Sequence, residues 1–400
     1  MGYILEVDLE YPRCLHDAHN DYPLAPEHLE ITDSMLSPFQ KRYFPPINGK
    51  IKKLTPNLRD KEKYVVHYRT LKLYLSLGMK IKKIHRTIQF EQSSWMKPYI
   101  NLNTNLRKVA TQKGDKVGKD LFKLMNNAVF GKTCENLRKR INFEVVTSRK
   151  TALKRFAKPN FKRAVRFRED LVGIHTIKPV LILNRPIHVG FTILDISKYH
   201  MYNFHYNIWL NQFPCSHLLF TDTDSLAYEV IGHDVYAGMS LIKDEFDFSE
   251  YPKDHFLYST DNMKVVGKFK DECHGLAMLK FVGLRPKLYS YEYERIGYFE
   301  LDGTEVEKPT NTSVEKIVIS NKNTGKGIKD NVRKEFTLDD YKDNLHQMKP
   351  LVKEMNSIHS IGHNLYSCKV DKISLSAFDN KRWILEDGIR TLAYGHYNTL

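Results

Sequence analysis

Cysteine is scarce and scattered in this sequence. Its five cysteines are odd in number and never spaced as CxxC: Cys14, Cys134, Cys215, Cys273 and Cys368. A disulfide framework usually shows an even number of cysteines, and a zinc module of the common kind shows closely spaced pairs. The pattern therefore supports neither.

Long apolar runs, targeting signals and internal repeats are also lacking. The longest clean aliphatic run is Val180 to Leu183, far short of the roughly 20 residues that a membrane-spanning helix needs. The first residues lack the basic start and small-residue cleavage site of a secretory signal. No repeat indicates a solenoid. We expect a soluble, intracellular protein with no membrane partner.

Positive charge is present in excess. The chain holds 62 Lys and Arg against 47 Asp and Glu, a formal net charge of +15 over 400 residues. From Arg149 to Arg168 there are nine basic residues and no acidic one. An excess of this kind favours a polyanionic partner, nucleic acid before an anionic membrane surface. A charge run can also be only a solvated face, and its role stays open.

Hydrophobic spacing predicts mixed helices and strands, and therefore the α+β class. Helices are expected over 120–138, with apolar Leu121 and Leu124, over 193–207, with Leu194, Met201 and Phe204, and through Leu71 to Leu77. Residues 64–68 (YVVHY) predict a short strand. The stretch 4–26 mixes apolar residues with Pro and His, which indicates an irregular surface segment.

An acidic pair stands between two apolar runs. Residues 217–220 and 225–230 flank Thr221-Asp222-Thr223-Asp224, the pattern of a β-hairpin. Carboxylates two residues apart at a hairpin tip are hard ligands suited to Mg²⁺. Asp and Thr are also favoured turn residues, so an ordinary polar turn is the alternative. The apolar flanks favour the metal site, because they predict that the pair lies at a buried sheet.

A second pattern lies on the helix expected over 120–138. In KLMNNAVFG, Lys123, Asn127, Phe130 and Gly131 recur three to four residues apart and so share one helix face. A lysine, an amide and an aromatic ring could meet a phosphate, a base pair and a sugar. An ordinary amphipathic helix is the alternative. Asn in a helix interior argues weakly against that alternative. Arg107 lies upstream, on a stretch that could form a partner helix.

These patterns together resemble the family B DNA polymerases. Lys123-x-x-x-Asn127-Ala128-x-Phe130-Gly131 is similar to the family's KxxxNSxYG motif, and Phe220-Thr221-Asp222-Thr223-Asp224-Ser225 is similar to YxDTDS. Lys287-Leu288-Tyr289 is similar to the KxY motif that holds the primer strand. The flanking sequence segments, including GYILEVDLEYP and KRWILEDGIRTLAYGHY, resemble those of the protein-primed mobile-element and viral branch of the family. Polinton/Maverick transposon polymerases are the nearest likeness.

One motif of the family is not found. Family B catalysis needs a third carboxylate from a DxxSLYP-type motif ahead of the KxxxNSxYG motif. Asp8 precedes Tyr11 by three positions rather than five, and Glu6 has the right spacing with the wrong side chain. Both are interpreted as imitations of the motif, with Asp8 the better candidate. The family's proofreading exonuclease is not found either. The sequence thus predicts the carboxy-terminal portion of a polymerase, without the first catalytic aspartate.

The resemblance implies a right-hand architecture, incomplete at its amino-terminal end. The expected parts are a palm remainder or insertion over 1–60, fingers over 61–140, palm with the Asp-Thr-Asp hairpin over 141–300 and thumb over 301–400. It implies primer-template DNA and deoxynucleoside triphosphates as partners, a terminal protein primer as a further partner, and two Mg²⁺ ions as cofactors. For a transposon or viral product, the nucleus is a reasonable compartment.

The resemblance also implies roles for single residues. Asp222 and Asp224 would be the catalytic metal ligands. Lys123 and Arg107 would hold the triphosphate, while Asn127, Phe130 and Gly131 would line the nascent base pair. Lys287 and Tyr289 would grip the primer end. Lys326, Lys381 and Arg382 are candidate contacts to duplex phosphates, although solvated surface positions explain these three residues equally well.

Three function classes remain open from the sequence. The first is a DNA-directed DNA polymerase, and the second is a catalytically inactive nucleic-acid-binding remnant of a mobile-element polymerase. The third is a metal-dependent nuclease built on Asp222 and Asp224. It is the weakest, because no further acidic ligands are evident in the sequence.

Overall fold

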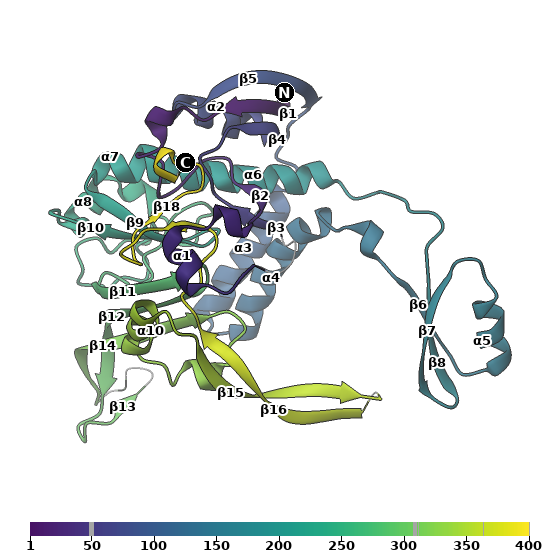
Figure 1. Cartoon of the computed structure of the whole chain (residues 1–400). Helices are drawn as coiled ribbons and strands as arrows, with labels where there is room; N and C mark the ends of the chain where they lie inside the picture. The colour runs from purple at the N-terminus through teal and green to yellow at the C-terminus, as the bar shows by residue number, and fades with distance from the viewer. Residues whose placement is uncertain (48–51, 307–309, 311, 363, 400) are drawn as a thin grey trace. The chain divides into compact units, whose positions relative to one another are not determined.

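The computed structural model describes residues 1–47, 52–306, 310, 312–362 and 364–399. Contacts within the chain divide it into two compact units, each assembled from separate stretches of sequence. The first unit holds residues 1–93, 195–353 and 371–400, and the second holds 94–194 and 354–370. Figure 1 labels the elements of both. The four-part palm, fingers and thumb division stays a prediction.

A three-stranded antiparallel sheet begins the first unit, in the order β4-β1-β5. Its strands are β1 (Gly2–Glu10), β4 (Lys61–His67) and β5 (Lys80–Phe90), and α2 (Tyr68–Ser76) joins β4 to β5. Val7 and Leu9 are fully buried and belong to a hydrophobic core that also contains Val66 and Tyr74. The expectation of an irregular surface segment over 4–26 was therefore wrong for β1. The strand signal was present in the sequence, because apolar and acidic side chains alternate strictly over residues 5–11 (LEVDLEY).

Helices and an aromatic core support the acidic hairpin. The hairpin consists of β9 (Ser216–Thr221) and β10 (Leu226–Val230), as the sequence predicts. The chain reaches it through α6 (Ile187–Asn203), a π-helical turn η4 (Phe204–Trp209) and α7 (Leu210–Gln212). After it come α8 (Val235–Leu241) and the 3-10 turn η5 (Lys243–Glu245). Phe204, Trp209 and Phe213 lie in the core beneath the hairpin. The expected helix over 193–207 is confirmed, although Leu194 is 43% exposed.

A longer antiparallel sheet follows the hairpin. It contains β11 (Met278–Arg285), β12 (Leu288–Phe299), β13 (Glu305–Val306) and β14 (Val314–Gly325), with β12 paired to the other three. Helices α9 (Asp330–Arg333) and α10 (Leu338–Gln347) come next. α10 begins in a capping box between Thr337 and Asp340 and ends at Met348 in the left-handed conformation.

Short elements near the two chain ends complete the first unit. Gln40 donates to the carbonyls of Asp379 and Arg382, and Arg382 donates to that of Asn20, so residues 379–396 lie against the amino-terminal stretch. The elements are η1 (Arg13–Leu15), β2 (Glu27–Glu30), η2 (Asp33–Met35), α1 (Pro38–Tyr43), β3 (Lys52–Thr55), β17 (Trp383–Ile384), β18 (Thr391–Leu392) and η6 (Tyr397–Thr399).

The second unit contains a helical hairpin and a small sheet. α3 (Lys97–Gln112) and α4 (Lys116–Thr133) are joined by a turn in which Asp115 caps α4 by accepting from the Gly118 N–H at 2.9 Å. After η3 (Leu137–Lys139) come β6 (Asn142–Val146), α5 (Arg149–Phe156), β7 (Phe161–Arg168) and β8 (Leu171–Thr176), paired in the order β6-β8-β7.

Two further features concern the chain as a whole. β15 (Leu351–Ile361) and β16 (Asn364–Leu375) form a hairpin that the division between the units crosses.

Among the helices that the structure describes, none combines the length and apolarity needed to span a membrane.

Candidate active site

The tip of the β9–β10 hairpin is a tight turn. The Asp222 N–H donates to the Ser225 carbonyl at 3.1 Å, and Thr223 between them has a φ of +62°. A β-branched residue in the left-handed region is strained, so the surrounding contacts must hold this turn. Asp222 is half-buried and Asp224 is exposed. Among the residues that the structure describes, no third strand pairs with this hairpin. The predicted hairpin is confirmed, and the predicted buried sheet at its tip is wrong.

Lys287 binds the Asp222 carboxylate. Its ammonium nitrogen lies 2.5 Å from Oδ1 and 2.6 Å from Oδ2, so both carboxylate oxygens accept from one donor group. Lys287 stands in the turn between β11 and β12 and, like Thr223, has a positive φ of +63°. Two tight turns that are 65 positions apart in the sequence thus face each other through one ion pair.

Aromatic rings join the same two hairpins. The ring of Phe220 in β9 stacks on Tyr289 in β12, with centroids 4.4 Å apart, and on Phe281 in β11 at 5.5 Å. Stacked aromatic pairs contribute about 0.5–1.5 kcal/mol beyond their buried area. Asp222, Lys287 and Tyr289, which the sequence placed in two separate motifs, therefore lie in one cluster, the hairpin cluster.

Buried histidines and tyrosines support the hairpin cluster. Tyr228 in β10 is hydrogen-bonded to Nδ1 of His205 at 2.9 Å. Tyr22 interacts with the Thr221 side chain, and burial raises the pKa of its phenol to about 12. Burial also lowers the pKa of both His19 and His205 to about 4. These buried histidines and tyrosines were not predicted as part of the site. Their dense spacing in HNDY (19–22) and YNFHYN (202–207) could have indicated a buried polar cluster.

The described residues do not fit a centre for two metal ions. Among them, no group of three or more His, Cys, Asp or Glu side chains is arranged to hold a metal. Both carboxylate oxygens of Asp222 accept from the Lys287 ammonium. Asp224 is the carboxylate of the pair that does not contact Lys287. The metal-dependent nuclease hypothesis finds no support in this arrangement.

Asp8 is held by its own sheet. Its Oδ1 accepts from the Lys63 N–H at 2.7 Å and lies 2.8 Å from Nε2 of His85. These hydrogen bonds, that of Lys63 first, lower the pKa of the Asp8 carboxyl. Both edges of β1 are occupied, by β4 and β5, and neither is used by the β9–β10 hairpin. Asp8 is thus not on a strand paired with the acidic hairpin, and Glu6, which lies near Arg86, is on the same strand.

The three carboxy-terminal candidates differ in their surroundings. The Lys326 N–H donates to the Lys287 carbonyl at 3.1 Å, which puts Lys326 beside the hairpin cluster. Burial lowers the pKa of the Lys381 ammonium; the Asp379 charge opposes this shift, and the positive charges of Lys53 and Lys287 add to it. The Arg382 guanidinium bonds Thr391 and the Asn20 carbonyl. These bonds favour a structural role for Arg382, and its contact with DNA stays a prediction.

The nucleotide-binding candidates belong to the second unit. Lys123, Asn127 and Gly131 on α4 are exposed, and Phe130 is half-buried. On α3, Nε of Arg107 is buried and finds no hydrogen-bond partner among the described residues. These residues lie on the two helices that the sequence predicted, and their convergence with the hairpin cluster stays a prediction.

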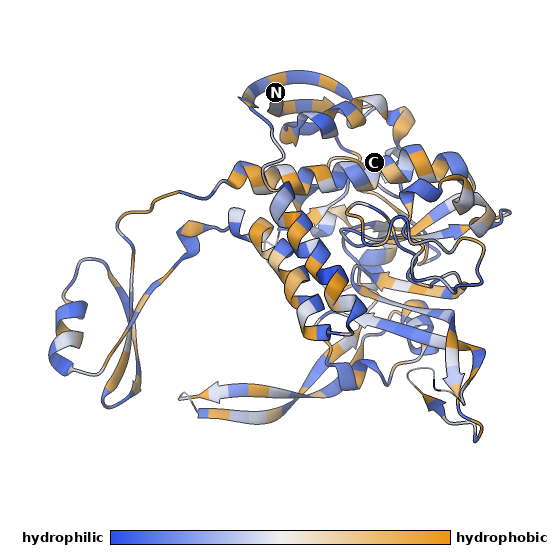
Figure 2. Cartoon of the chain, turned by 180° about the vertical axis from the view of Figure 1, so that it is seen from behind, coloured by the Kyte–Doolittle hydropathy of each residue, from blue (hydrophilic) through white to orange (hydrophobic). Residues whose placement is uncertain are grey.

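The interior asparagine of α4 has a structural use. The Asn103 amide, which is buried on α3, donates to Asn126 on α4 at 3.0 Å. The apolar face expected for the helix is not buried, because Leu121 is 50% and Leu124 62% exposed. Figure 2 shows these apolar stretches along both helices. Their spacing predicted the helix correctly, and both leucines lie on an exposed face of it.

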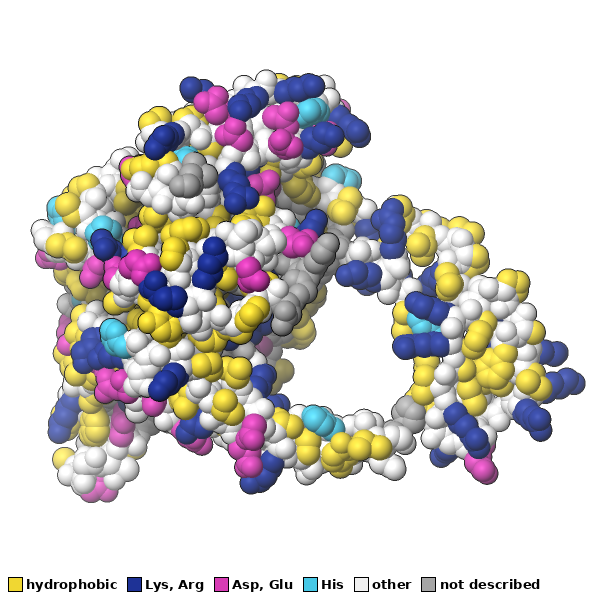
Figure 3. All heavy atoms as spheres, in the orientation of Figure 1, with side chains coloured by type: hydrophobic (Ala, Val, Ile, Leu, Met, Phe, Trp, Pro, Cys, Tyr) yellow, Lys and Arg dark blue, Asp and Glu magenta, His cyan; other side chains and the backbone are white. Residues whose placement is uncertain are grey.

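The basic run from Arg149 to Arg168 forms α5 and β7. Figure 3 shows Lys and Arg side chains gathered over this part of the second unit. Arg155 pairs with Glu144, while Lys150, Lys154, Lys158, Lys162 and Arg163 are exposed. The run is a solvated basic face, and its role as a contact stays open.

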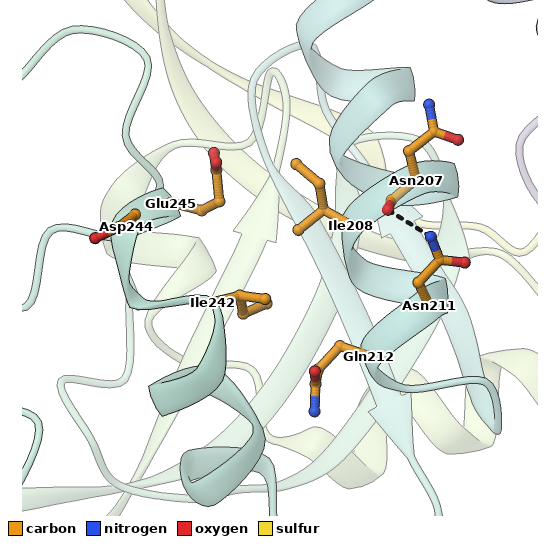
Figure 4. A pocket seen from close by; sticks show the side chains of 7 residues that line it. All are labelled: Asn207, Ile208, Asn211, Gln212, Ile242, Asp244 and Glu245. Carbon is orange, nitrogen blue, oxygen red and sulfur yellow. Dashed lines mark hydrogen bonds between the residues drawn. The ribbon is translucent and has the colours of Figure 1, made fainter.

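Pockets also lie elsewhere in the first unit. One of about 390 Å³ is lined by none of the candidate residues. Figure 4 shows its amide, acidic and isoleucine side chains: Asn207, Ile208, Asn211, Gln212, Ile242, Asp244 and Glu245. Another, of about 200 Å³, is lined by charged residues around Asp8: Asp60, Lys61, Glu62, Lys63, Lys82 and His85.

Comparison with known proteins gives one similarity. The family model described as DNA polymerase type B, organellar and viral, matches residues 11–169. The match covers less than half of the chain. It includes the Lys123 motif but neither the acidic hairpin nor Lys287, so it is independent of the hairpin cluster. Comparison with curated proteins and with solved structures gives no match.

Proposed function

We propose that this chain is part of a family B DNA polymerase, which adds deoxynucleotides to a primer 3′ hydroxyl as a DNA template directs. The observation that carries the proposal is the contact between Asp222 and Lys287 beside stacked Phe220 and Tyr289. Two segments that resemble motifs of one family, distant in sequence, meet in space. The stretch that the family model matches contains the segment that resembles a third motif.

Each group has a role in that reaction. The primer 3′ oxygen forms a bond to the α-phosphorus, and the bond to pyrophosphate breaks. Lys123 and Arg107 would hold the triphosphate, and Asn127, Phe130 and Gly131 would line the new base pair. Lys287 and Tyr289 would hold the primer end, where positioning supplies much of the rate. Lys326 and Lys381 would contact duplex phosphates.

The proposal includes magnesium only as the family's cofactor. Two Mg²⁺ ions would supply charge stabilisation for phosphoryl transfer, with Asp222 and Asp224 as their ligands. The described residues do not form a complete centre for them, so the roles above are those of the chain's own side chains. Finer assignments are proposals as well: the Polinton/Maverick branch, a terminal protein primer and an intracellular site of action.

A second candidate function has a specific observation in its favour. The Asp222 carboxylate is engaged by Lys287, and no third acidic ligand stands with Asp222 and Asp224 among the described residues. A chain in that state would hold primer-template DNA through its basic surface without incorporating nucleotides. This DNA-binding remnant is the alternative to the polymerase.

Primer extension separates the two. Residues 1–400 are incubated with labelled primer-template DNA, all four deoxynucleotides and Mg²⁺ or Mn²⁺, and DNA binding is followed in parallel by anisotropy. Template-directed incorporation that is lost in Asp224→Asn and kept in Glu229→Gln, an exposed acid on the same hairpin, supports the polymerase. Binding without incorporation supports the remnant. Absence of both contradicts the proposed function in either form.

A further inference from the structure

The hairpin cluster contains a cation of its own. We propose that Lys287 is a built-in counter-cation of Asp222: it excludes divalent metal from that carboxylate until a DNA phosphate draws the ammonium away. The DNA-dependent half of this inference rests on the proposed polymerase function, because it takes the primer strand as the source of the phosphate. The exclusion of metal rests on the geometry alone.

The contact uses the whole carboxylate. Nζ of Lys287 is 2.5 Å from one oxygen of Asp222 and 2.6 Å from the other, a bridging position between the two. A small divalent cation bound to Asp222 would use the same oxygens. An ammonium and a divalent cation that share one carboxylate lie within a few ångströms of each other and repel strongly. Occupation by one therefore disfavours the other.

The backbone holds this contact in register. Lys287 and Thr223 both adopt the left-handed conformation, and each stands in a turn between two paired strands. The Phe220–Tyr289 stack packs the acidic hairpin against β12. The Lys326 N–H bond to the Lys287 carbonyl ties the Lys287 turn to the end of β14. An isolated surface pair contributes only about 0–1 kcal/mol because its side chains must be ordered for it. Here much of that ordering is already present.

The pair is also accessible to a competitor. The side chains of Lys287 and Asp222 are 45% and 32% exposed. A phosphate group offers Lys287 an acceptor of equal or greater charge, and a lysine ammonium can turn its three donors to a new partner. Once Lys287 has turned to a phosphate, the Asp222 carboxylate is released from the ammonium beside the exposed Asp224. Its Oδ1 still accepts from the Thr223 hydroxyl at 3.4 Å. DNA and metal would then bind together more readily than either alone.

Such coupling must be reciprocal. If bound DNA raises the affinity for metal through Lys287, bound metal raises the affinity for DNA by the same factor. A lysine that only adds positive charge to the surface would not produce this dependence. The hairpin β11–β12 supplies a matched comparison, because Lys280 pairs with Glu292 at 2.7 Å without touching the acidic hairpin.

Manganese binding tests the exclusion. Free Mn²⁺ is measured by electron paramagnetic resonance in titrations of the DNA-free chain and of Lys287→Met, Lys287→Gln, Lys287→Arg and Lys280→Met. We expect Lys287→Met and Lys287→Gln to bind Mn²⁺ roughly tenfold more tightly at the hairpin, a gain that Asp222→Asn in the same background removes. Lys287→Arg and Lys280→Met should match the unmodified chain. Circular dichroism confirms that each variant is folded.

DNA affinity tests the exchange. Anisotropy with a primer-template that ends in a dideoxynucleotide is measured at fixed ionic strength, with Mn²⁺ and with an equivalent amount of a monovalent salt. We expect Mn²⁺ to tighten binding by the unmodified chain several-fold and to have no such effect on Lys287→Met. The dideoxy end prevents incorporation, so the measurement does not depend on catalysis.

The outcomes separate this inference from the proposed function. Equal Mn²⁺ affinity in the unmodified chain and both neutral variants overturns the counter-cation role, even if the chain is an active polymerase. Mn²⁺-dependent DNA affinity that persists in Lys287→Met overturns the exchange. If the chain binds no DNA, the polymerase proposal and the exchange both fail, while tighter Mn²⁺ binding by the neutral variants still supports the exclusion.

Discussion

The ring of Phe220 lies on the ring of Tyr289, with the centroids 4.4 Å apart and the planes inclined by 24°. Through this contact β9 is packed against β12, and the residues that follow Phe220 in the chain reach Lys287 at the turn before Tyr289. The stack therefore positions an acidic turn against a basic one. Without it, the Asp222–Lys287 pair would lose the support of its two hairpins.

Replacement of Phe220 tests that relationship. We expect Phe220→Ala to destabilise the first unit by roughly 1–3 kcal/mol, less than the 3–5 kcal/mol of a fully buried phenylalanine, because Phe220 is only half-buried. Phe220→Tyr keeps the ring and should stay within about 0.5 kcal/mol of the parent. Urea unfolding followed by tryptophan fluorescence measures both. Equal stability of the alanine variant and the parent would show that the stack does not hold the hairpins.

Some of this architecture could be predicted from the sequence. Two apolar runs around Thr-Asp-Thr-Asp give a hairpin because the turn residues and the flanking strands agree. The contact between Asp222 and Lys287 could not be derived from local pattern, since it depends on how two hairpins pack across 65 positions. Family resemblance alone placed the two motifs in one site, and it gave Lys287 a DNA partner rather than a carboxylate.

Other errors have local causes. β1 was missed although Leu5, Val7 and Leu9 alternate with acidic residues, because the Pro and His residues that follow it decided the interpretation of the whole stretch 4–26. The helix at Leu121 was predicted from its spacing, which fixes a face but not what covers it. Asn103, which bonds Asn126, is a polar residue whose burial only the packing of α3 on α4 reveals.

Acid should destabilise the first unit through two buried histidines. His19, which is bonded to Tyr11, and His205, which is bonded to Tyr228, have folded pKa values lowered by burial from 6.5 to about 4. Between those values the unfolded chain binds more protons, so the free energy of unfolding falls as pH drops from 6.5 towards 4. Each histidine contributes on the order of 3 kcal/mol over that range.

Urea midpoints at pH 7, 6, 5 and 4.5 measure this dependence. His205→Gln retains a hydrogen-bonding side chain beside Tyr228 and should flatten the decline relative to the parent. His274→Gln is the matched control, because His274 is exposed and should leave the slope unchanged. A parent and a His205→Gln variant with identical slopes would exclude His205 as the acid-sensitive group.

DNA binding should depend steeply on salt. With a formal net charge of +15 and about five to eight phosphates neutralised, the logarithm of affinity should fall with the logarithm of salt concentration at a slope of roughly −4 to −7. Anisotropy titrations between 50 and 200 mM salt, ~fourfold in concentration, measure the slope. Lys381→Ala should reduce its magnitude by about 1, whereas Lys41→Ala, on α1 and outside the candidate residues, should not. A slope near zero would contradict binding through phosphates.

Asp8 provides the last prediction, and it separates a sheet residue from a catalytic one. Asp8 accepts from Lys63 and lies beside His85 within the β4-β1-β5 sheet, so Asp8→Ala should lower the urea midpoint slightly without changing DNA affinity or any nucleotide incorporation. Asp224→Asn, at the exposed hairpin tip, should leave stability within about 0.5 kcal/mol and remove whatever incorporation the chain shows. Urea unfolding and primer extension on both variants give the two readouts. Incorporation that is abolished by Asp8→Ala in a folded protein would mean that Asp8 supplies the third carboxylate, and that β1 approaches the acidic hairpin when DNA is bound.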